Sequence, residues 1–342
     1  MMGKTLRATV IRLAVIIAAA VGTMPAVADD KITIIVSSIE KQIYLPAKLA
    51  EQLGYLKQTG LDIELRSVPA GANAEKEMLL GLAQGVIGFY DHTIHLQARG
   101  KLVQSVIQFS QAPGEVALVS KAAAKRIRSP ADFKGKTLGV TALGSSTHFL
   151  MHFLANNAGV KTGEFATLPV GAGEKFIAAL RQGKIDAGMT TEPTLSRLTA
   201  YGDASILVDL RSVASTEAVL GGTYPGACLY MPKAWVDKNR DAVQKIVTAF
   251  VQTLRYIDTH DAREIAEKMP PEYYGEEKVL YIEALKAGKS MFTADGMMPE
   301  NGPPTVLRIL REFDKAVQGK PINLANTYTT EFVKAARQAF PE

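Results

Sequence analysis

From residue 31 onward, short apolar runs alternate with longer segments whose apolar residues recur every three to four positions. Such runs indicate buried strands, and the longer segments indicate amphipathic helices. Because short polar loops join the two kinds of segment, the pattern predicts βαβ units and largely parallel sheets. The expected strands cover 31–36, 62–68, 86–90, 103–109, 116–120, 137–140, 167–170, 185–190, 205–209 and 228–231.

The helical pattern dominates the last third of the chain. Its segments carry Lys, Arg and Glu between apolar positions, as solvated amphipathic helices do. Further helices are expected between the strands, including one that begins at Ser145-Ser146-Thr147. The expected helices cover 44–53, 74–82, 173–181, 192–201, 236–259, 262–268, 276–289, 303–317 and 329–340.

Two Gly- and Pro-rich breaks interrupt the alternation, at 111–115 (QAPGE) and 220–226 (LGGTYPG). A pattern of G-A-x, helix, Q-G-x-I and strand begins at residue 71 and again at residue 171, which is typical of two similar lobes. We therefore expect two hinge crossings and two lobes. Lobe 1 would be discontinuous, from residues 29–113 and 222–342, and lobe 2 would be inserted as residues 114–221.

The first 28 residues carry the features of an export signal. Lys4, Arg7 and Arg12 are basic, residues 10–21 are mainly apolar, and an A-x-A site ends at Ala28. The apolar run is too short to span a bilayer as a helix. The segment predicts a Sec signal peptide cleaved after Ala28 and a periplasmic protein; the alternative is an N-terminal core helix.

Charge and cysteine content exclude several classes of function. Removal of the predicted signal lowers the formal charge from +5 to +2, so the mature chain has no basic excess that would favour nucleic acid or a membrane surface. The single cysteine, Cys228, excludes an internal disulfide and a cysteine metal cluster. We expect a monomer that binds neither nucleic acid nor a cofactor.

Polar side chains gather where the predicted strands end. Open α/β sheets bind ligands at the carboxyl ends of their strands, so these side chains are the candidate ligand contacts. They include hydroxyl, amide, carboxylate and imidazole groups. The candidate ligand-binding residues are Ser38, Gln42, Asn73, Tyr90, Asp91, His92, Ser145, Ser146, Thr147, His148, Thr191, Glu192 and Tyr224.

Two alternatives remain open at these positions. The helix start at Ser145 is either an ordinary N-cap or a place where free N–H groups hold an oxyanion. Asp91 and Glu192 either cap their own helices or face the ligand, and in the second case they favour a positive or hydrogen-donating end. A zwitterion such as taurine, or an aminopyrimidine, would satisfy both features.

Enzyme motifs are incomplete. His148 and His152 have the H-x-x-x-H spacing, but Phe149 stands where a zinc hydrolase needs Glu. The segment 135–137 (GKT) imitates the end of a P-loop, but Pro130 replaces its first Gly. The residues therefore predict a binding protein without catalytic or metal-ligating groups.

Several motifs together resemble one family. The segment 44–64 (YLPAKLAEQLGYLKQTGLDIE), the segment 129–140 (SPADFKGKTLGV), the helix start at 144–148 (GSSTH) and the segment 183–187 (GKIDA) are similar to those of ABC-importer substrate-binding proteins of the nitrate, sulfonate and taurine type. That family shares its domain with the thiamine-pyrimidine-synthesis proteins. The resemblance covers residues 31–230.

The resemblance implies a type 2 periplasmic binding protein. Such a protein captures a small organic anion or zwitterion, such as a sulfonate or taurine, between its lobes and delivers it to the permease of an ABC transporter. The alternatives are a receptor for an aminopyrimidine, thiamine-precursor-like or aromatic ligand, and an enzyme related to the thiamine-pyrimidine synthases. The lack of that enzyme branch's cysteine-rich motif argues against an enzyme, and the lack of a Trp before Glu192-Pro193 argues against a ligand held by ring stacking.

Overall fold

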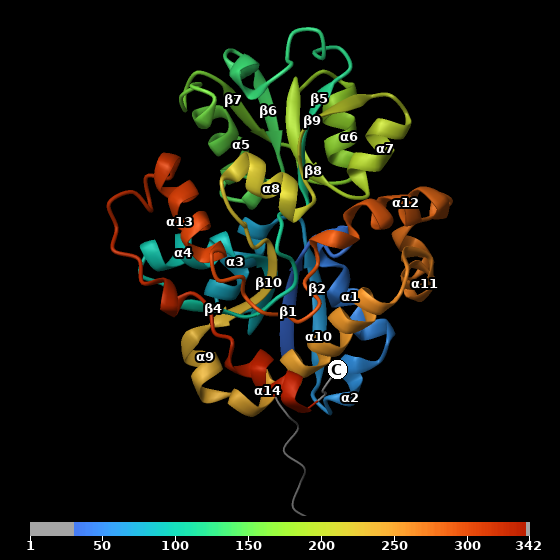
Figure 1. Ribbon diagram of the computed structural model, residues 1–342, viewed down its shortest axis with the longest axis vertical. Coiled ribbons are helices and arrows are strands. Elements are labelled where there is room, and N and C mark those ends of the chain that lie inside the picture. The colour runs from blue at the N-terminus through green and yellow to red at the C-terminus, as the bar shows by residue number, and fades with distance from the viewer. Residues whose placement is uncertain (1–30, 340–342) are drawn as a thin grey trace, which may run out of the picture. The chain divides into compact units, whose positions relative to one another are not determined.

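The computed structural model describes residues 31–339 (Figure 1). The predicted signal peptide and its cleavage site lie outside the described residues. The described chain contains two five-stranded sheets with helices on their faces. This confirms the predicted α/β architecture with two mostly parallel sheets.

The first sheet has four strands in one direction and one reversed strand. Its order is β2-β1-β3-β10-β4, and β10 is antiparallel to both of its neighbours. The pairs β1–β2 and β1–β3 are parallel. The strands are β1 (Ile32–Ser37), β2 (Ile63–Val68), β3 (Gly85–Phe89), β4 (Val103–Gln108) and β10 (Ala227–Pro232).

The second sheet repeats this plan. Its order is β7-β6-β8-β5-β9, and β5 is the reversed strand in the same fourth position. In each sheet the reversed strand follows directly after one of the Gly- and Pro-rich breaks. The lobe boundaries at these breaks stay a prediction. The strands are β5 (Glu115–Ser120), β6 (Thr137–Val140), β7 (Ala166–Pro169), β8 (Ala187–Thr191) and β9 (Ala204–Leu210).

Most helices lie where the pattern predicts them. Those between the strands are α1 (Leu45–Gln52), α2 (Tyr55–Gln58), α3 (Gly71–Leu79), α4 (Asp91–Ala98), α5 (Ser146–Asn157), α6 (Glu174–Arg181), α7 (Thr194–Ala200) and α8 (Val213–Leu220). Those of the last third are α9 (Lys233–Lys238), α10 (Arg240–Thr259), α11 (Ala262–Lys268), α12 (Lys278–Gly288), α13 (Gly302–Phe313) and α14 (Glu331–Ala339). Short 3-10 turns are η1 (Gln42–Tyr44), η2 (Pro130–Phe133), η3 (Pro271–Tyr273), η4 (Lys289–Met291) and η5 (Leu324–Asn326).

The helices differ from the prediction in two places. The single helix expected over 236–259 is divided at Asn239, whose side-chain amide donates to the carbonyl of Trp235. Asn competes with the helix ladder in this way, so it ends α9 and begins α10. Helix α8 was not expected at all. Its signals are a Ser212 N-cap and Gly221 at φ 71°, which are local capping features rather than an apolar stripe.

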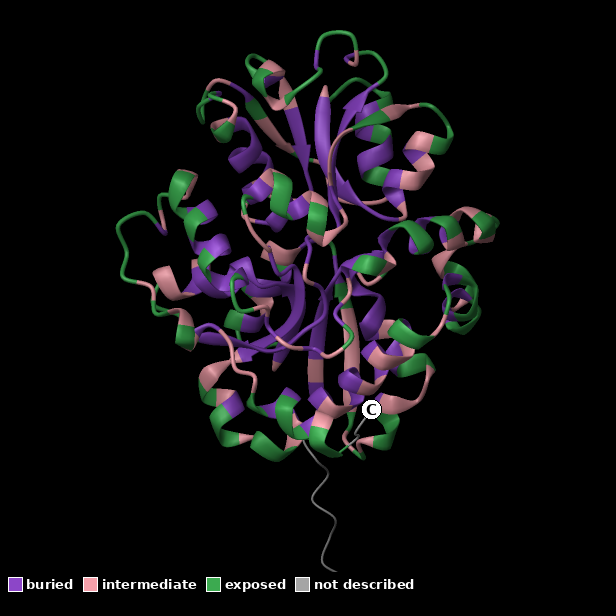
Figure 2. Ribbon diagram, viewed as in Figure 1, coloured by how far each residue is buried: buried purple, intermediate pink, exposed green. Residues whose placement is uncertain are grey.

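The central strands of both sheets are buried, and the outer helix faces are exposed (Figure 2). Gly114 precedes β5 at a φ of 67°, and a Cβ there would collide with the side chains of Met291 and Ile43. Glycine is therefore required at this crossing, and the residue that follows it, Glu115, is buried. Among residues 31–339, no helix has the length and apolar character that crossing a bilayer would need.

Candidate functional site

Two buried carboxylates and the side chains around them form the candidate site. Glu115 interacts electrostatically with Lys41, Asp91 and His92. Tyr44 and Tyr224 each interact with both carboxylates. All of these side chains are less than a tenth exposed. We call this cluster the polar centre; it consists of Lys41, Tyr44, Asp91, His92, Glu115, Ser146 and Tyr224.

Asp91 is supplied by the first sheet. It begins α4 directly after β3, and it is fully buried. The hydroxyl of Tyr224 donates to its Oδ2 at 2.9 Å, whereas its Oδ1 has no hydrogen-bond partner. The nearest cationic atom to Oδ1 is His92 Nε2 at 3.8 Å, beyond hydrogen-bond range. Burial raises the pKa of Asp91, which is the expected effect on a carboxyl group short of donors.

His92 is turned partly toward a second acid. Its Nδ1 lies 3.0 Å from Glu75 Oε2, and Arg99 pairs with the other oxygen of Glu75 at 3.1 Å. Burial lowers the pKa of His92, but the hydrogen bond with Glu75 and the charge of Asp91 outweigh it and raise the pKa overall. Of the two acids beside His92, Glu75 therefore has a partner for each oxygen, whereas Asp91 keeps one oxygen without a partner.

Glu115 is supplied by the second sheet and was missed from the sequence. It is the first residue of β5, and it pairs with Thr191 in the antiparallel register. Ser146 donates to its Oε1 at 2.6 Å, while its Oε2 has no partner. Burial raises the pKa of Glu115 to about 8 and lowers the pKa of Lys41. A charged residue that opens an otherwise apolar strand after a Gly-rich crossing is the signal that could have found it.

At the start of α5, some side chains hold the local structure through hydrogen bonds, and one hydroxyl has no partner. Thr147 Oγ1 accepts the backbone N–H of Thr141, so it ties the end of β6 to the helix. Ser145 Oγ is buried and has no partner. His148 Nδ1 accepts the N–H of Gly144, and burial lowers the pKa of His148 to about 4. Because Ser146 holds Glu115, the helix start already faces a carboxylate of the chain itself.

Glu192 lies outside the polar centre. Arg211 donates to its Oε1 at 2.9 Å, and the N–H of Ser196 in α7 donates to its Oε2 at 2.9 Å. Both oxygens are therefore used by the protein. Of the two carboxylates expected at the site, Asp91 has a free oxygen and Glu192 caps a helix; Glu115 is the second carboxylate near Asp91.

Of three further candidates from the sequence, Gln42 has an unpartnered side-chain oxygen, whereas Tyr90 and Asn73 do not belong to the polar centre. Gln42 is buried; its amide nitrogen donates to the carbonyl of Tyr281, and its Oε1 has no partner. Its backbone N–H donates to the carbonyl of Glu192, which joins the segments of the two sheets. The hydroxyl of Tyr90 is hydrogen-bonded to Thr327 rather than to a residue of the polar centre, and Asn73 is exposed on α3.

Ser38 lines a groove. It is the one described residue other than glycine with a positive φ, 69°, and its hydroxyl donates to the carbonyl of Pro69 at 2.7 Å. Strained backbone of this kind is often kept at binding sites. The groove has a volume of about 560 Å³ and is lined by both sheets' loops, including Ser38 and Lys41 on one side and Gly171, Gly173 and Thr194 on the other.

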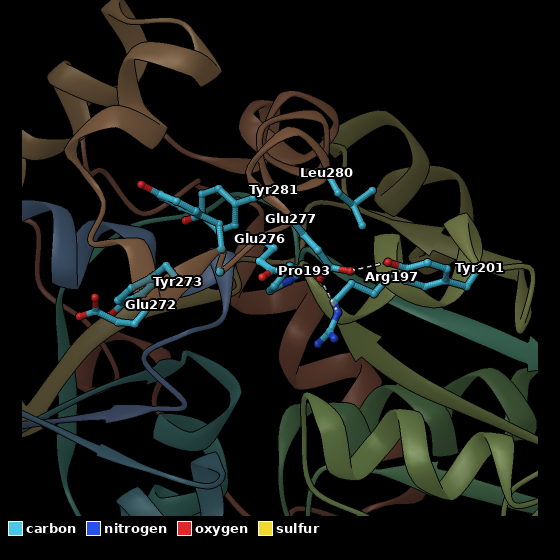
Figure 3. A pocket seen from close by; sticks show the side chains of 11 residues that line it. Pro193, Arg197, Tyr201, Glu272, Tyr273, Glu276, Glu277, Leu280 and Tyr281 are labelled. Atoms are coloured by element: carbon cyan, nitrogen blue, oxygen red, sulfur yellow. Dashed lines mark hydrogen bonds and ion pairs between the residues drawn. The ribbon is translucent and has the colours of Figure 1, made fainter.

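A second hollow of about 490 Å³ adjoins this groove and shares Pro193, Arg197 and Tyr273 with it. Figure 3 shows Glu277 between Arg197 and Tyr201: Arg197 Nε lies 2.8 Å from one of its carboxylate oxygens, and the Tyr201 hydroxyl donates to the other at 2.7 Å. These contacts join α7 to the segment that begins α12. All three side chains are partly exposed, so they are a surface contact rather than part of the polar centre.

The described residues offer neither an activated thiol nor a cluster of metal ligands. Cys228 is fully buried, and burial raises the pKa of its thiol, so it cannot serve as a thiolate nucleophile. Among the described residues no group of three or more His, Cys, Asp or Glu side chains could hold a metal ion.

Several buried polar atoms in and around the centre have no partner. They come from β1, η1, α4, β5, β10 and the N-cap residue of α5. Buried polar atoms in folded proteins are nearly always hydrogen-bonded, so such a group of exceptions calls for an explanation. The atoms are Ser37 Oγ, Gln42 Oε1, Asp91 Oδ1, Glu115 Oε2, Ser145 Oγ and Tyr230 Oη.

Comparison with known proteins places the chain in a family. The family model described as NMT1/THI5 like matches residues 44–263. A solved structure from Bordetella bronchiseptica RB50 is 34% identical, with a TM-score of 0.87 over 91% of this chain and 98% of that one. A search of the curated proteins finds no match.

More distant solved structures share the fold. The alkanesulfonate-binding protein SsuA from Xanthomonas axonopodis pv. citri, bound to MOPS, is 17% identical, with a TM-score of 0.70 over 87% of this chain and 98% of that one. The periplasmic nitrate-binding protein NrtA from Synechocystis PCC 6803 is 12% identical, with a TM-score of 0.70 over 92% and 90%. The desulfurization enzyme DSZB is 16% identical, with a lower TM-score of 0.56 over 90% and 99%.

Proposed function

The chain belongs to the NMT1/THI5-like family, and we propose that it is the solute-binding receptor of an ABC importer. It captures a small solute between two lobes and delivers it to a membrane permease. Residues 29–113 with 222–342 form one lobe, and residues 114–221 form the other. The binding proteins SsuA and NrtA, which share the fold, support this proposal.

The unpartnered polar atoms carry the proposal. They are buried, they come from the segments of both sheets, and two of them belong to carboxylates that interact with each other. A buried polar group without a hydrogen-bond partner destabilises the folded protein by about 1–3 kcal/mol. Six such groups together would therefore be strongly destabilising unless a bound molecule forms hydrogen bonds with them. A solute enclosed between the lobes supplies the missing partners.

The solute is a small organic zwitterion or anion of the taurine or sulfonate kind. Lys41 lines the groove and offers a positive charge for an acidic end. Asp91 and Glu115 favour a nitrogen-bearing end, which also keeps an aminopyrimidine as the alternative solute. The solute contacts drawn from the sequence-based set are Ser38, Gln42, Asp91, Ser145 and Tyr224.

The receptor works in the periplasm as a monomer. The predicted Sec signal, cleaved after Ala28, directs it there, and the periplasmic nitrate-binding neighbour supports that location. N-terminal sequencing of protein recovered from the periplasmic fraction tests the prediction. A mature chain beginning at Asp29 is expected, and a chain retaining residues 1–28 would contradict it.

A thermal-shift screen of the mature protein tests the function. The panel contains taurine, alkanesulfonates, nitrate, aromatic acids and aminopyrimidines. A solute at 100 times its Kd stabilises the folded state by about 2.7 kcal/mol, which raises the Tm of a chain of this size by about 5 °C. The function is contradicted if no compound shifts the Tm, or if compounds that bind are turned over.

Asn73→Ala is the matched control for the screen. Asn73 is exposed on α3 and was a site candidate from sequence alone. A compound bound between the lobes shifts the Tm of this variant as it shifts that of the wild type. A compound whose shift disappears in the variant binds at α3 instead.

A further inference from the structure

We infer that the solute donates N–H groups, from an ammonium or an amino-substituted heterocycle, to Asp91 and Glu115. This inference rests on the proposed function and names the chemistry of the solute. It predicts that a solute without N–H donors, such as nitrate or a simple alkanesulfonate, is a poor ligand.

The first support is the kind of atom left without a partner. Asp91 Oδ1, Glu115 Oε2 and Gln42 Oε1 can only accept hydrogen bonds when the carboxyls are ionised, and their residues are at most 1% exposed. The other unpartnered atoms of the site are hydroxyl oxygens, which can donate or accept. These three acceptor oxygens therefore need donors.

The second support is the closeness of the two carboxylates. The charges of Asp91 and Glu115 act on each other and on the same two phenols, Tyr44 and Tyr224. One of these phenols, Tyr224, is already used by Asp91 Oδ2. A nitrogen with two or more hydrogens offers one donor to each of the two unpartnered oxygens.

The third support is that the cationic side chains of the protein do not form hydrogen bonds with the unpartnered oxygens of Asp91 and Glu115. His92 shares its Nδ1 with Glu75, and its Nε2 stays 3.8 Å from Asp91. The Lys41 ammonium interacts with Glu115 and lies 6.0 Å from the centroid of the Tyr44 ring, but it makes no hydrogen bond within the described part of the chain, and Lys41 also lines the groove. Lys41 is therefore available to the acidic end of a zwitterion.

The fourth support concerns the start of α5, where an external oxyanion would be expected. A helix N-terminus favours negative charge. Here Ser146 donates to Glu115, so the chain places its own carboxylate at that position. At a pH above the raised pKa values of Glu115 and Asp91, where both carboxyls are ionised, a solute that is only an anion would meet them as like charges.

Matched pairs of probes test the inference. Taurine is compared with ethanesulfonate, and 4-aminopyrimidine with pyrimidine, by calorimetry on the mature protein. The amino member of the pair that binds is expected to bind at least about tenfold more tightly, the effect of one hydrogen bond to a charged group. Equal or tighter binding of the member without the amino group would overturn the inference while leaving the receptor function intact.

Two variants locate the effect. D91N and E115Q keep the shape and the hydrogen bonds from Tyr224 and Ser146, and each is expected to weaken the amino member about tenfold and to reduce the preference within the pair. E283Q is the control, because Glu283 is an exposed carboxylate on α12 that does not line the groove. Unchanged affinities in both D91N and E115Q would refute the assignment.

A ligand-free measurement covers the case in which none of the four probes binds. If the two carboxylates are kept for a solute, D91N and E115Q leave the Tm of the ligand-free protein unchanged or raise it, since binding groups are often kept at a cost in stability. A lower Tm in both variants would show that the carboxylates are structural and would overturn the inference. The wider screen still judges the receptor function separately.

Discussion

The two sheets have the same strand order, but the polar residues at their strand ends serve different purposes. In the first sheet, Asp91 keeps an oxygen without a partner. In the second, Thr147 ties down the end of β6, and Glu192 is consumed by Arg211 and the start of α7. The second sheet contributes two exceptions: Glu115, which begins its reversed strand, and Ser145, which precedes α5. Although the two sheets share a topology, the first sheet therefore supplies most of the unpartnered polar groups, and most polar residues at the strand ends of the second sheet hold the structure together.

The largest effect is expected where a support of the second sheet is removed. Arg211→Ala leaves the carboxylate of Glu192, 2% exposed, without its cation. Removal of one partner of a buried pair costs about 3–5 kcal/mol, and the partial exposure of Arg211 favours the lower end. Urea unfolding measures it. A loss below about 1 kcal/mol would show that Glu192 is not a fixed support.

A pair of hydroxyl variants separates support from binding at the start of α5. Thr147→Val leaves the buried N–H of Thr141 unpaired and is expected to cost about 1–3 kcal/mol of stability, with the solute affinity of the folded protein retained. Ser145→Ala removes an unpartnered hydroxyl, so affinity falls and stability does not. Chemical unfolding measures the stability and calorimetry the solute affinity. A loss of affinity in Thr147→Val together with a loss of stability in Ser145→Ala would contradict the comparison.

Ser146→Ala affects the arrangement of Glu115. It removes the hydroxyl that donates to Glu115 Oε1. The loss of a hydrogen bond to a charged group, about 1.5–3 kcal/mol, is expected to appear as weaker solute binding of roughly tenfold or more. Calorimetry with the solute found in the screen checks it. Wild-type affinity in this variant would show that Glu115 does not need to be positioned.

The pH dependence of stability gives a smaller, signed test. Because burial raises the pKa of Glu115 to about 8, folding stabilises its protonated form. That contribution is complete below the unfolded value of about 4.5 and is lost as pH rises through 8. The raised pKa values of Asp91 and His92 act in the same direction.

His148 in α5 sets the lower limit of the pH range in which the effect of Glu115 can be measured. The pKa of His148 is lowered to about 4, so its contribution is lost as pH falls from about 6.5 toward 4. Between pH 6.5 and 8 the ligand-free wild type should therefore lose stability as pH rises, and E115Q should lose less. The difference in Tm between the two proteins isolates Glu115, and parallel curves would contradict the shift.

The smallest effect is expected at the surface contact of Figure 3. Glu277→Gln weakens the contacts to Arg197 and Tyr201, whose side chains are partly exposed. Exposed ion pairs contribute about 0–1 kcal/mol, so stability should change by about 0.5 kcal/mol or less. Urea unfolding in low and high salt checks this. A loss comparable to that of Arg211→Ala would place this contact among the main supports.

The sequence predicts the fold better than the site. Strand runs such as 137–140 are recognisable locally, because burial on both faces demands continuous apolar residues. The site depends on contacts between distant residues: Asp91 meets Tyr224, 133 positions away. No periodic pattern reports such a contact, nor that Glu192 finds Arg211 while Asp91 finds no donor for its second oxygen.

The most direct test of the account is the affinity of the solute for a protein without the two carboxylates. Calorimetry compares the wild type, the D91N/E115Q double variant and Asn73→Ala with the solute that the screen identifies. The account predicts a loss of about 100-fold in the double variant, one hydrogen bond to a charged group at each position, and none in Asn73→Ala. Wild-type affinity in a correctly folded double variant would contradict it.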